Sequence, residues 1–366
     1  MVTAKKTQQP ETAPPRVLVV GNYCHDVLIQ NGSVVAESLG GAASFISNVL
    51  NGMSINCHLV SKVGYDFKYN TFHAPIVMPT SKTTVFKAYF DSGTDENCHK
   101  DRVLKRVCAC DPIMPSDLPD ERFDFGMVVG VGGEILPQTI EKMIDICCSV
   151  FIDIQALIRV FDDANDGTVN MVGLKDSGFY HLLPRITVLK VSSEEALVMD
   201  LEEVRKWCCV VVTSGKDGCN LYWRDGELQI LPFAANQVDP TGAGDSFLGG
   251  LVAGLFHDLS LPDAALMGNF FGSLTVEQIG LPKLDLRLLQ MARDEVHKRK
   301  DQTINSIDSR RDEKLKFVKA AGHEQFHASL SASKRLSICV DDKCHRDVPN
   351  SQKQPSKIVA TDNLTC

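Results

Sequence analysis

The stretch of residues 237–255, QVDPTGAGDSFLGGLVAGL, constrains the fold more than any other part of this chain. Its turn of small residues, 241–245, leads into a run of small and apolar residues that predicts a helix from about Ser246. A glycine-rich turn at a helix N-terminus leaves backbone N–H groups unpaired, and with the helix dipole these groups form an anion site. Because glycine lacks a Cβ, a phosphate can approach closely, and Asp245 is placed to accept a proton beside it. The alternative interpretation is an ordinary helix start with an acidic first turn.

The rest of the chain alternates short β-branched runs with helical runs, which predicts an α/β fold with a mostly parallel sheet covered on both faces. Strands are expected at residues 16–20, 57–64, 83–90, 103–108, 123–131, 150–154, 186–191 and 209–213. Ligands of such sheets bind at the carboxyl ends of the strands. Positions that follow expected strands should therefore meet at one rim: Asp26, Asp66, Ser192, Gly215 and Gly242.

Composition and charge exclude several classes of protein. A net charge of −8 and a pI near 5.7 argue against a nucleic-acid partner, which would require a basic surface. No apolar run approaches the roughly 18 residues that span a bilayer, and the N-terminus lacks the apolar segment of a signal peptide. The thirteen cysteines are therefore expected to be free thiols in a reducing, cytoplasmic environment, with 147–148 and 208–209 packed in the core. The sequence leaves the oligomeric state open.

Motifs for other chemistries are incomplete. Cys339, Cys344 and His345 lack a paired CxxC partner, so zinc is not expected. Residues 130–133 resemble a dinucleotide-binding loop, but Ile135 occupies the third glycine position. The sequence contains no GxxxxGK[ST] motif, which excludes a P-loop enzyme.

One folded domain, residues 16–300, is expected between two tails. Residues 1–15 are polar and contain proline, which predicts disorder. From about Met291, charged and then polar residues dominate, which predicts a helical stub followed by a disordered tail over residues 301–366.

The run DPTGAGD, residues 239–245, resembles the second signature of the ribokinase-like (PfkB) carbohydrate kinase family. Members of that family transfer the γ-phosphate of ATP to a hydroxyl of a sugar, nucleoside or polyol. The resemblance extends over residues 16 to about 300 and implies a ribokinase-like three-layer sandwich, with a small β-lid from strands within about 76–110. It also implies ATP and Mg²⁺ as cofactors, Asp245 as the catalytic base, and Gly242, Ala243 and Gly244 as the anion hole.

The first signature of the family places substrate hydroxyls on a strand-end Asp and a Gly-Gly pair, which implies these roles for Asp26, Gly40 and Gly41. From the residues alone, Asp26 equally suits a turn or a capping position. Phe45 stands where many members have Asn. That departure puts in doubt a ribose- or fructose-like substrate but not the kinase activity.

The family's N-x-x-E motif, which helps to organise Mg²⁺ and phosphate, falls at Ser192 and Glu195, with Ser in place of Asn. The resemblance implies a metal-linked role for Glu195, through water. A capping box, with Ser at the cap and Glu three residues later, explains the same pair structurally. The remaining residues implied to contact the nucleotide, besides the anion-hole residues, are Ser192, Ser193, Thr213, Gly215, Gly218, Thr241 and Asn269.

Within the family, the segments VLVVGNYCHDVLI, LGGAASFISNVL, FDFGMVVGVGGEILP and DIQALIRVF resemble members that phosphorylate myo-inositol. This implies myo-inositol as the acceptor, with Asp153 among the residues that bind it. The physical argument alone reaches only a small polyhydroxy acceptor. The alternatives are a sugar or nucleoside kinase of the same family, or a catalytically silent scaffold. The intact GAGD argues against the scaffold, whereas Ser192 mildly favours it.

Overall fold

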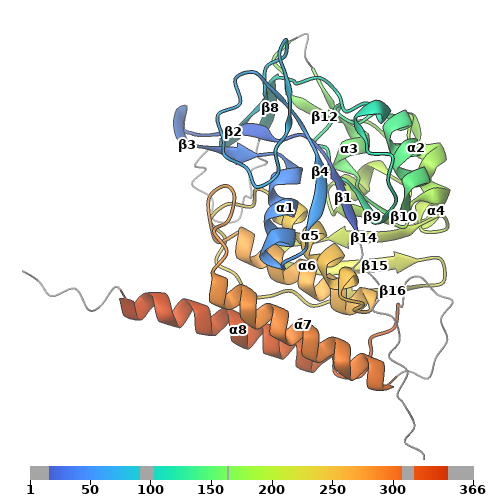
Figure 1. Cartoon of the computed structure of the whole chain (residues 1–366), viewed down its shortest axis with the longest axis vertical. Coiled ribbons are helices and arrows are strands. Elements are labelled where there is room, and N and C mark those ends of the chain that lie inside the picture. The colour runs from blue at the N-terminus through green and yellow to red at the C-terminus, as the bar shows by residue number, and fades with distance from the viewer. Residues whose placement is uncertain (1–15, 91–102, 163–164, 307–316, 345–366) are drawn as a thin grey trace, which may run out of the picture.

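The computed structural model describes residues 16–90, 103–162, 165–306 and 317–344 (Figure 1). Its centre is an eight-stranded sheet in the order β16-β15-β14-β13-β10-β9-β1-β4. The strands from β14 to β4 are parallel, β15 runs antiparallel to β14, and β16, antiparallel to β15, runs in the same direction as the parallel strands. The α/β fold with a mostly parallel sheet is confirmed. The strands are β1 (Val17–Val20), β4 (Cys57–Val60), β9 (Phe123–Val128), β10 (Cys147–Asp153), β13 (Val188–Ser192), β14 (Cys209–Thr213), β15 (Cys219–Trp223) and β16 (Gly226–Ile230).

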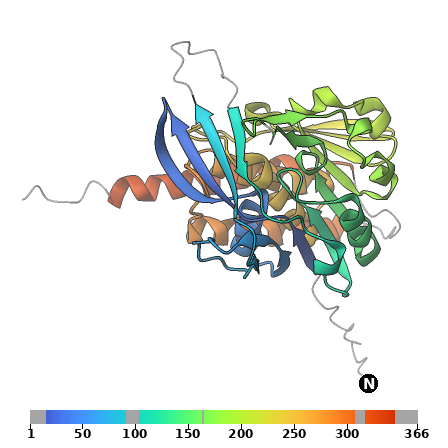
Figure 2. The ribbon, with the colours of Figure 1, turned by 90° about the horizontal axis from the view of Figure 1, so that it is seen from above.

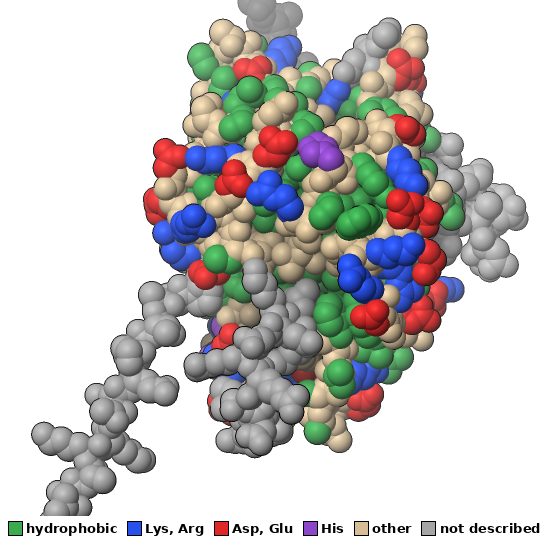
Figure 3. Space-filling model, turned by 90° about the vertical axis from the view of Figure 1, so that its right-hand side faces the viewer, with side chains coloured by type: hydrophobic (Ala, Val, Ile, Leu, Met, Phe, Trp, Pro, Cys, Tyr) green, Lys and Arg blue, Asp and Glu red, His purple; other side chains and the backbone are tan. Residues whose placement is uncertain are grey.

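Helices cover both faces of this sheet, which gives three layers (Figure 1). Because successive side chains of a strand point to opposite faces, Val17 and Val19 join one core cluster while Leu18 and Val20 join the other. The first cluster contains α1 (Ala42–Gly52), α5 (Ala243–Phe256) and α6 (Leu261–Thr275). The second contains α2 (Pro137–Ile146), α3 (Gln155–Ile158) and α4 (Leu201–Val204). On the face in Figure 3, acidic and basic side chains are interspersed.

A second sheet, in the order β3-β2-β7-β8, stands beside the main sheet as a lid (Figure 2). It consists of β2 (Cys24–Gln30), β3 (Ser33–Gly40), β7 (Thr84–Phe90) and β8 (Val103–Cys108). The lid is therefore larger than the expected strands within 76–110, and Asp26 lies inside β2 instead of following a strand. The missed signal is Asn31-Gly32, which have φ of 50° and 77° and form the tight turn between β2 and β3.

Two expected boundaries also shift. The expected strand at 57–64 divides into β4 and β5 (Lys62–Gly64), and β5 pairs with β6 (Ile76–Met78) in a small separate sheet. β10 begins at Cys147, whereas the strand was expected to begin at residue 150. As a result Cys147 is buried and Cys148 is exposed, so core packing holds for only one of that pair, whereas 208 and 209 are both buried.

The disordered tail expected over residues 301–366 is wrong for the part of it that the structure describes. α7 (Leu286–Ser306) and α8 (His323–Cys344) are long helices that lie together along the first face (Figure 1). α8 buries only a few apolar side chains, Phe326 and Leu330 among them, so its polar composition concealed it. Residues 1–15 and 345–366 lie outside the described residues. Within the described ranges, no helix is both long and apolar enough to cross a membrane.

Candidate active site

The loop before α5 is held in a conformation that only glycine adopts easily. Gly242 caps α5 with φ +72°, and an added Cβ would lie 2.2 Å from the ring of Phe45 in α1. The buried carboxylate of Asp239 accepts a hydrogen bond from Thr241 N at 2.9 Å and another from Gly280 N at 3.3 Å. These contacts fix the loop against the N-terminal end of α1.

The amides of this loop are only partly engaged. Ala243 N donates to Pro240 O at 3.3 Å, a long turn bond. In the described part of the chain, the N–H groups of Gly242 and Gly244 have no backbone acceptor. Because both amides lie at the positive end of the α5 dipole, the loop can bind an anion through at least these two donors.

Asp245 lies in the first turn of α5 beside that loop. Gln155 Nε2 donates to its Oδ1 at 2.9 Å, which orients the carboxylate. Burial raises the pKa of Asp245, and the charges of Lys190 and Arg159 oppose this shift only in part. A buried carboxylate with a raised pKa is a stronger base than an exposed aspartate and suits general-base chemistry.

Lys190 is the main residue that the sequence analysis missed. It lies in β13 opposite Asp153 of β10, and its Nζ donates to Asp153 Oδ2 at 3.0 Å. A Cβ added to Gly244 would be 2.6 Å from this Nζ, so a buried ammonium group touches the α5 N-terminus. Burial alone would lower the pKa of Lys190, but the charges of Asp153, Glu195 and Asp245 outweigh it and raise the pKa. A charged residue inside the buried strand VLKVS is the signal that could have identified it.

Asp153 lies beneath the site. Its carboxylate is fully buried between Lys190 Nζ and Gln155 N, 3.2 Å from the latter, and burial raises its pKa to about 6. The expected contact of Asp153 with an acceptor stays a prediction; in the structure its carboxylate supports Lys190.

Glu195 and Ser192 form the reciprocal bonds of a capping box, and the segment that follows is a short 3-10 helix, Glu195–Val198. Ser192 N donates to Glu195 Oε2 at 3.0 Å, and Glu195 N donates to Ser192 Oγ at 3.1 Å. Arg159 Nη2 donates to the other oxygen, Oε1, at 2.9 Å. Burial would raise the pKa of Glu195, but the charges of Lys190 and Arg159 and the bonds from Ser192 lower it. Both oxygens are thus engaged, and the described residues contain no cluster of three metal-ligand side chains.

The residues expected to hold the acceptor come together at the base of the lid. A Cβ on Gly40 would lie 2.0 Å from the Asp26 carboxyl, so the two are in direct contact, and Gly41 precedes α1 with φ +85°. Burial raises the pKa of the Cys24 thiol, and the charges of Asp26 and Asp245 both add to this shift. The charges of the two carboxylates therefore both act on the same sulfur.

The expected nucleotide residues form two groups. Ser193 N donates to Thr213 O at 2.9 Å, which joins the ends of β13 and β14 next to Ser192. Farther along the sheet, Asn269 Nδ2 donates to Ile230 O at 3.3 Å, and a Cβ on Gly218 would be 2.3 Å from the same oxygen. Gly215 and Gly218 both have positive φ, 52° and 85°, in the turn that connects the two groups.

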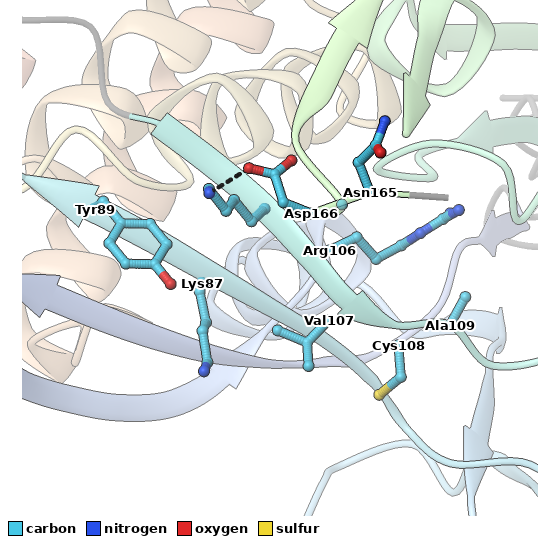
Figure 4. Close-up of a pocket in the computed structure, with 10 residues that line it drawn as sticks. Lys87, Tyr89, Arg106, Val107, Cys108, Ala109, Asn165 and Asp166 are labelled. Atoms are coloured by element: carbon cyan, nitrogen blue, oxygen red, sulfur yellow. Dashed lines mark hydrogen bonds and ion pairs between the residues drawn. The ribbon is translucent and has the colours of Figure 1, made fainter. Parts of the chain in front are cut away.

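A cavity of about 530 Å³ lies elsewhere, on the lid (Figure 4). It is lined by β7, β8 and residues 165–167, and an ion pair of 2.5 Å joins Lys105 to Asp166 at its edge. None of the residues expected in the site lines this cavity.

Solved structures define the class of fold. A pyrophosphate-dependent kinase in the ribokinase family, complexed with a pyrophosphate analog and myo-inositol, superposes with a TM-score of 0.59 at 17% identity, over 73% of this chain and 97% of that chain. The nucleoside kinase of Methanocaldococcus jannaschii, an archaeal member of the ribokinase family, superposes with a TM-score of 0.57 at 18% identity, over 80% and 100% of the two chains. The three layers and the lid are therefore those of a ribokinase-like protein.

Sequence comparison gives the family. The pattern of the pfkB family carbohydrate kinases matches residues 164–284. The inositol 3-kinase of Arabidopsis thaliana is 61% identical over 94% of this chain and 91% of its own length. The inositol 3-kinase of Oryza sativa subsp. japonica is 48% identical over 88% of this chain and 82% of its own length. The chain belongs to the pfkB family of carbohydrate kinases, and it is a phosphotransferase with an alcohol group as acceptor.

Proposed function

We propose that this protein uses ATP to phosphorylate myo-inositol and yields myo-inositol 3-phosphate. The observation that carries the proposal is the partly buried carboxylate of Asp245, with its raised pKa, which lies beside the open amides of Gly242 and Gly244 and the ammonium of Lys190. The choice of acceptor is supported by relatives named inositol 3-kinase, which share about half or more of their residues with nearly the whole chain.

In the proposed reaction, Asp245 accepts the proton of the attacking hydroxyl while Gln155 holds its carboxylate in place. The transferring phosphoryl group carries its negative charge on peripheral oxygens, so catalysis is mainly positioning and charge stabilisation. The N–H groups of Gly242 and Gly244, with Lys190 Nζ behind the latter, provide fixed positive charge for these oxygens.

The nucleotide would lie along the ends of β13 and β14, at Ser192, Ser193 and Thr213, and reach Gly215, Gly218 and Asn269 at the far end. Mg²⁺ bound to ATP would neutralise phosphate charge. Because both oxygens of Glu195 already accept hydrogen bonds, Glu195 would act on that ion through water, as Mg²⁺ retains part of its hydration shell.

The acceptor would bind between the lid and α1. Asp26 can accept bonds from two neighbouring hydroxyls, and the absence of a Cβ at Gly40 lets the Asp26 carboxylate lie directly against the backbone there. Asp153 contributes indirectly, because it holds Lys190.

Asp245→Asn tests the base directly. The variant should lose about 10²–10⁴-fold in kcat, the usual effect of removing a positioned general base, with the KM for ATP little changed. Asp225→Asn, at an exposed turn, is the matched control and should behave as the wild type. Near-full turnover by Asp245→Asn would show that another group accepts the proton.

A panel of acceptors separates the remaining alternatives. We expect ADP release with myo-inositol and little with ribose, fructose or adenosine. Preference for a sugar or adenosine would point to a sugar or nucleoside kinase, and no release with any acceptor would favour the silent scaffold. Pyrophosphate should be run in parallel as donor, because one structural neighbour is pyrophosphate-dependent.

A further inference from the structure

α8 contains buried polar side chains that the proposed mechanism does not use. Lys334 is only 4% exposed, and His327 lies about two turns before it in the same helix. Both contact residues 231–239, the irregular segment that connects β16 to the α5 loop.

The contacts of Lys334 join three pieces of backbone. Its Nζ donates to Ala234 O at 2.8 Å and to Ser273 O and Oγ at 3.2 and 3.0 Å. It also pairs with Glu277 Oε1 at 3.2 Å, and that oxygen accepts a bond from Asn236 N at 3.2 Å. One ammonium group therefore fixes the irregular segment to α6 at two points.

His327 holds the same segment closer to β16. Its Nε2 lies 2.9 Å from Pro232 O, and its ring is 4.5 Å from the ring of Phe233. Phe233 in turn packs against Phe270 of α6, with ring centroids 5.4 Å apart.

The irregular segment, residues 231–239, leads directly into the anion-binding loop before α5. Val238 N and Asp239 N both donate to Val276 O, at 2.7 and 3.1 Å. The Asp239 carboxylate then fixes Thr241 N, next to Gly242. A series of hydrogen bonds thus leads from α8 to the turn that caps α5.

A segment outside helices and sheets depends on side chains to satisfy its buried backbone groups, and a buried ammonium is costly unless it makes such bonds. We propose that α8 is a positioning element of the active site, in which Lys334, aided by His327, holds residues 231–239 so that the amides of Gly242 and Gly244 remain aimed at the phosphoryl group. This inference rests on the proposed function.

The test compares two variants of the full chain. Lys334→Met keeps the aliphatic stem and removes the bonds to the segment, whereas Leu330→Ala removes a fully buried apolar side chain from the same helix. We expect Lys334→Met to lose about tenfold or more in kcat, because small displacements of catalytic groups have effects of that size, with the KM for myo-inositol unchanged. Leu330→Ala should lower the thermal midpoint by at least as much and keep the wild-type kcat.

The inference fails if the two variants lose kcat in proportion to their loss of stability, or if Lys334→Met changes only the KM for myo-inositol. If Lys334→Met does not fold, His327→Phe decides, because it keeps the ring against Phe233 and loses the bond to Pro232. That variant should lose kcat by a few fold, and wild-type kcat would overturn the inference. A wild type without ADP release on myo-inositol would refute the proposed function instead, so the two failures are distinct.

Discussion

Gly242→Ala should lower both the free energy of unfolding and kcat. The backbone there has φ +72°, a left-handed conformation, and the ideal Cβ position lies 2.2–2.5 Å from three ring carbons of Phe45. Both features act on the loop that is proposed to bind the phosphoryl group, so a displaced loop should also lower kcat.

The expected magnitude has three parts. Left-handed backbone costs an L-residue roughly 1–2 kcal/mol. Overpacking against Phe45, which is 2% exposed and cannot move outward freely, typically adds about 1–3 kcal/mol. Alanine stiffens the unfolded chain and returns about 0.4–1 kcal/mol. The free energy of unfolding should therefore fall by about 1–5 kcal/mol.

The assay is urea unfolding of a double-mutant cycle with Phe45→Ala. In the Phe45→Ala background the clash is gone, so Gly242→Ala should cost only the backbone strain, with a coupling of about 1–3 kcal/mol between the two sites. Gly178→Ala is the control for strain alone, because Gly178 has φ +83° and nothing lies within 4 Å of its Cβ position. If Gly242→Ala matched Gly178→Ala in both backgrounds, the steric argument would be refuted.

Two further substitutions test the buried charges. Lys190→Met should lower kcat and move the acidic limb of the pH profile of kcat/KM to higher pH. The pKa of Asp245 is already raised by burial, and it should rise further because the variant removes the positive charge that opposes this shift. An acidic limb at the wild-type pH would contradict this coupling. Arg299→Met should lower the free energy of unfolding by about 3–5 kcal/mol, because the fully buried Asp263 carboxylate loses the guanidinium 2.8 Å away. The exposed Lys298→Met is its control, and an equal effect of the two in urea unfolding would argue against it.

The sequence predicted best those features that depend on a few consecutive residues. The glycine turn before α5, the buried strands and the Ser192–Glu195 pair each depend on a few consecutive residues, and all three appear in the structure. The parallel sheet then follows from general rules of chain connection, so the rim with its strand-end residues could also be anticipated.

The missed features depend on contacts between distant residues. Lys190 acquires its place from Asp153, 37 residues away, and from Gly244. Lys334 is buried because Ala234, 100 residues away, offers it a carbonyl. Composition treats both lysines as surface residues. For Lys190 the local signal was a charged residue inside the buried strand VLKVS, whereas the polar composition of α8 gave no such signal for Lys334.

The charged side chains around Asp245 explain why Lys190 is needed at this location. Three carboxylates, those of Asp153, Glu195 and Asp245, share only two cations, Lys190 and Arg159. Burial, with a smaller contribution from the charge of Glu195, keeps the pKa of Asp245 raised, which favours proton removal, but the surplus negative charge of the three carboxylates would repel a phosphoryl group. A cation must therefore lie between the carboxylates and the anion-binding turn, and Lys190 Nζ, bonded to Asp153 and touching Gly244, has that place. Its charge thus keeps Asp245 ionised to lower pH and supports the turn, so that replacing it should leave Asp245 protonated to higher pH and weaken phosphoryl binding together.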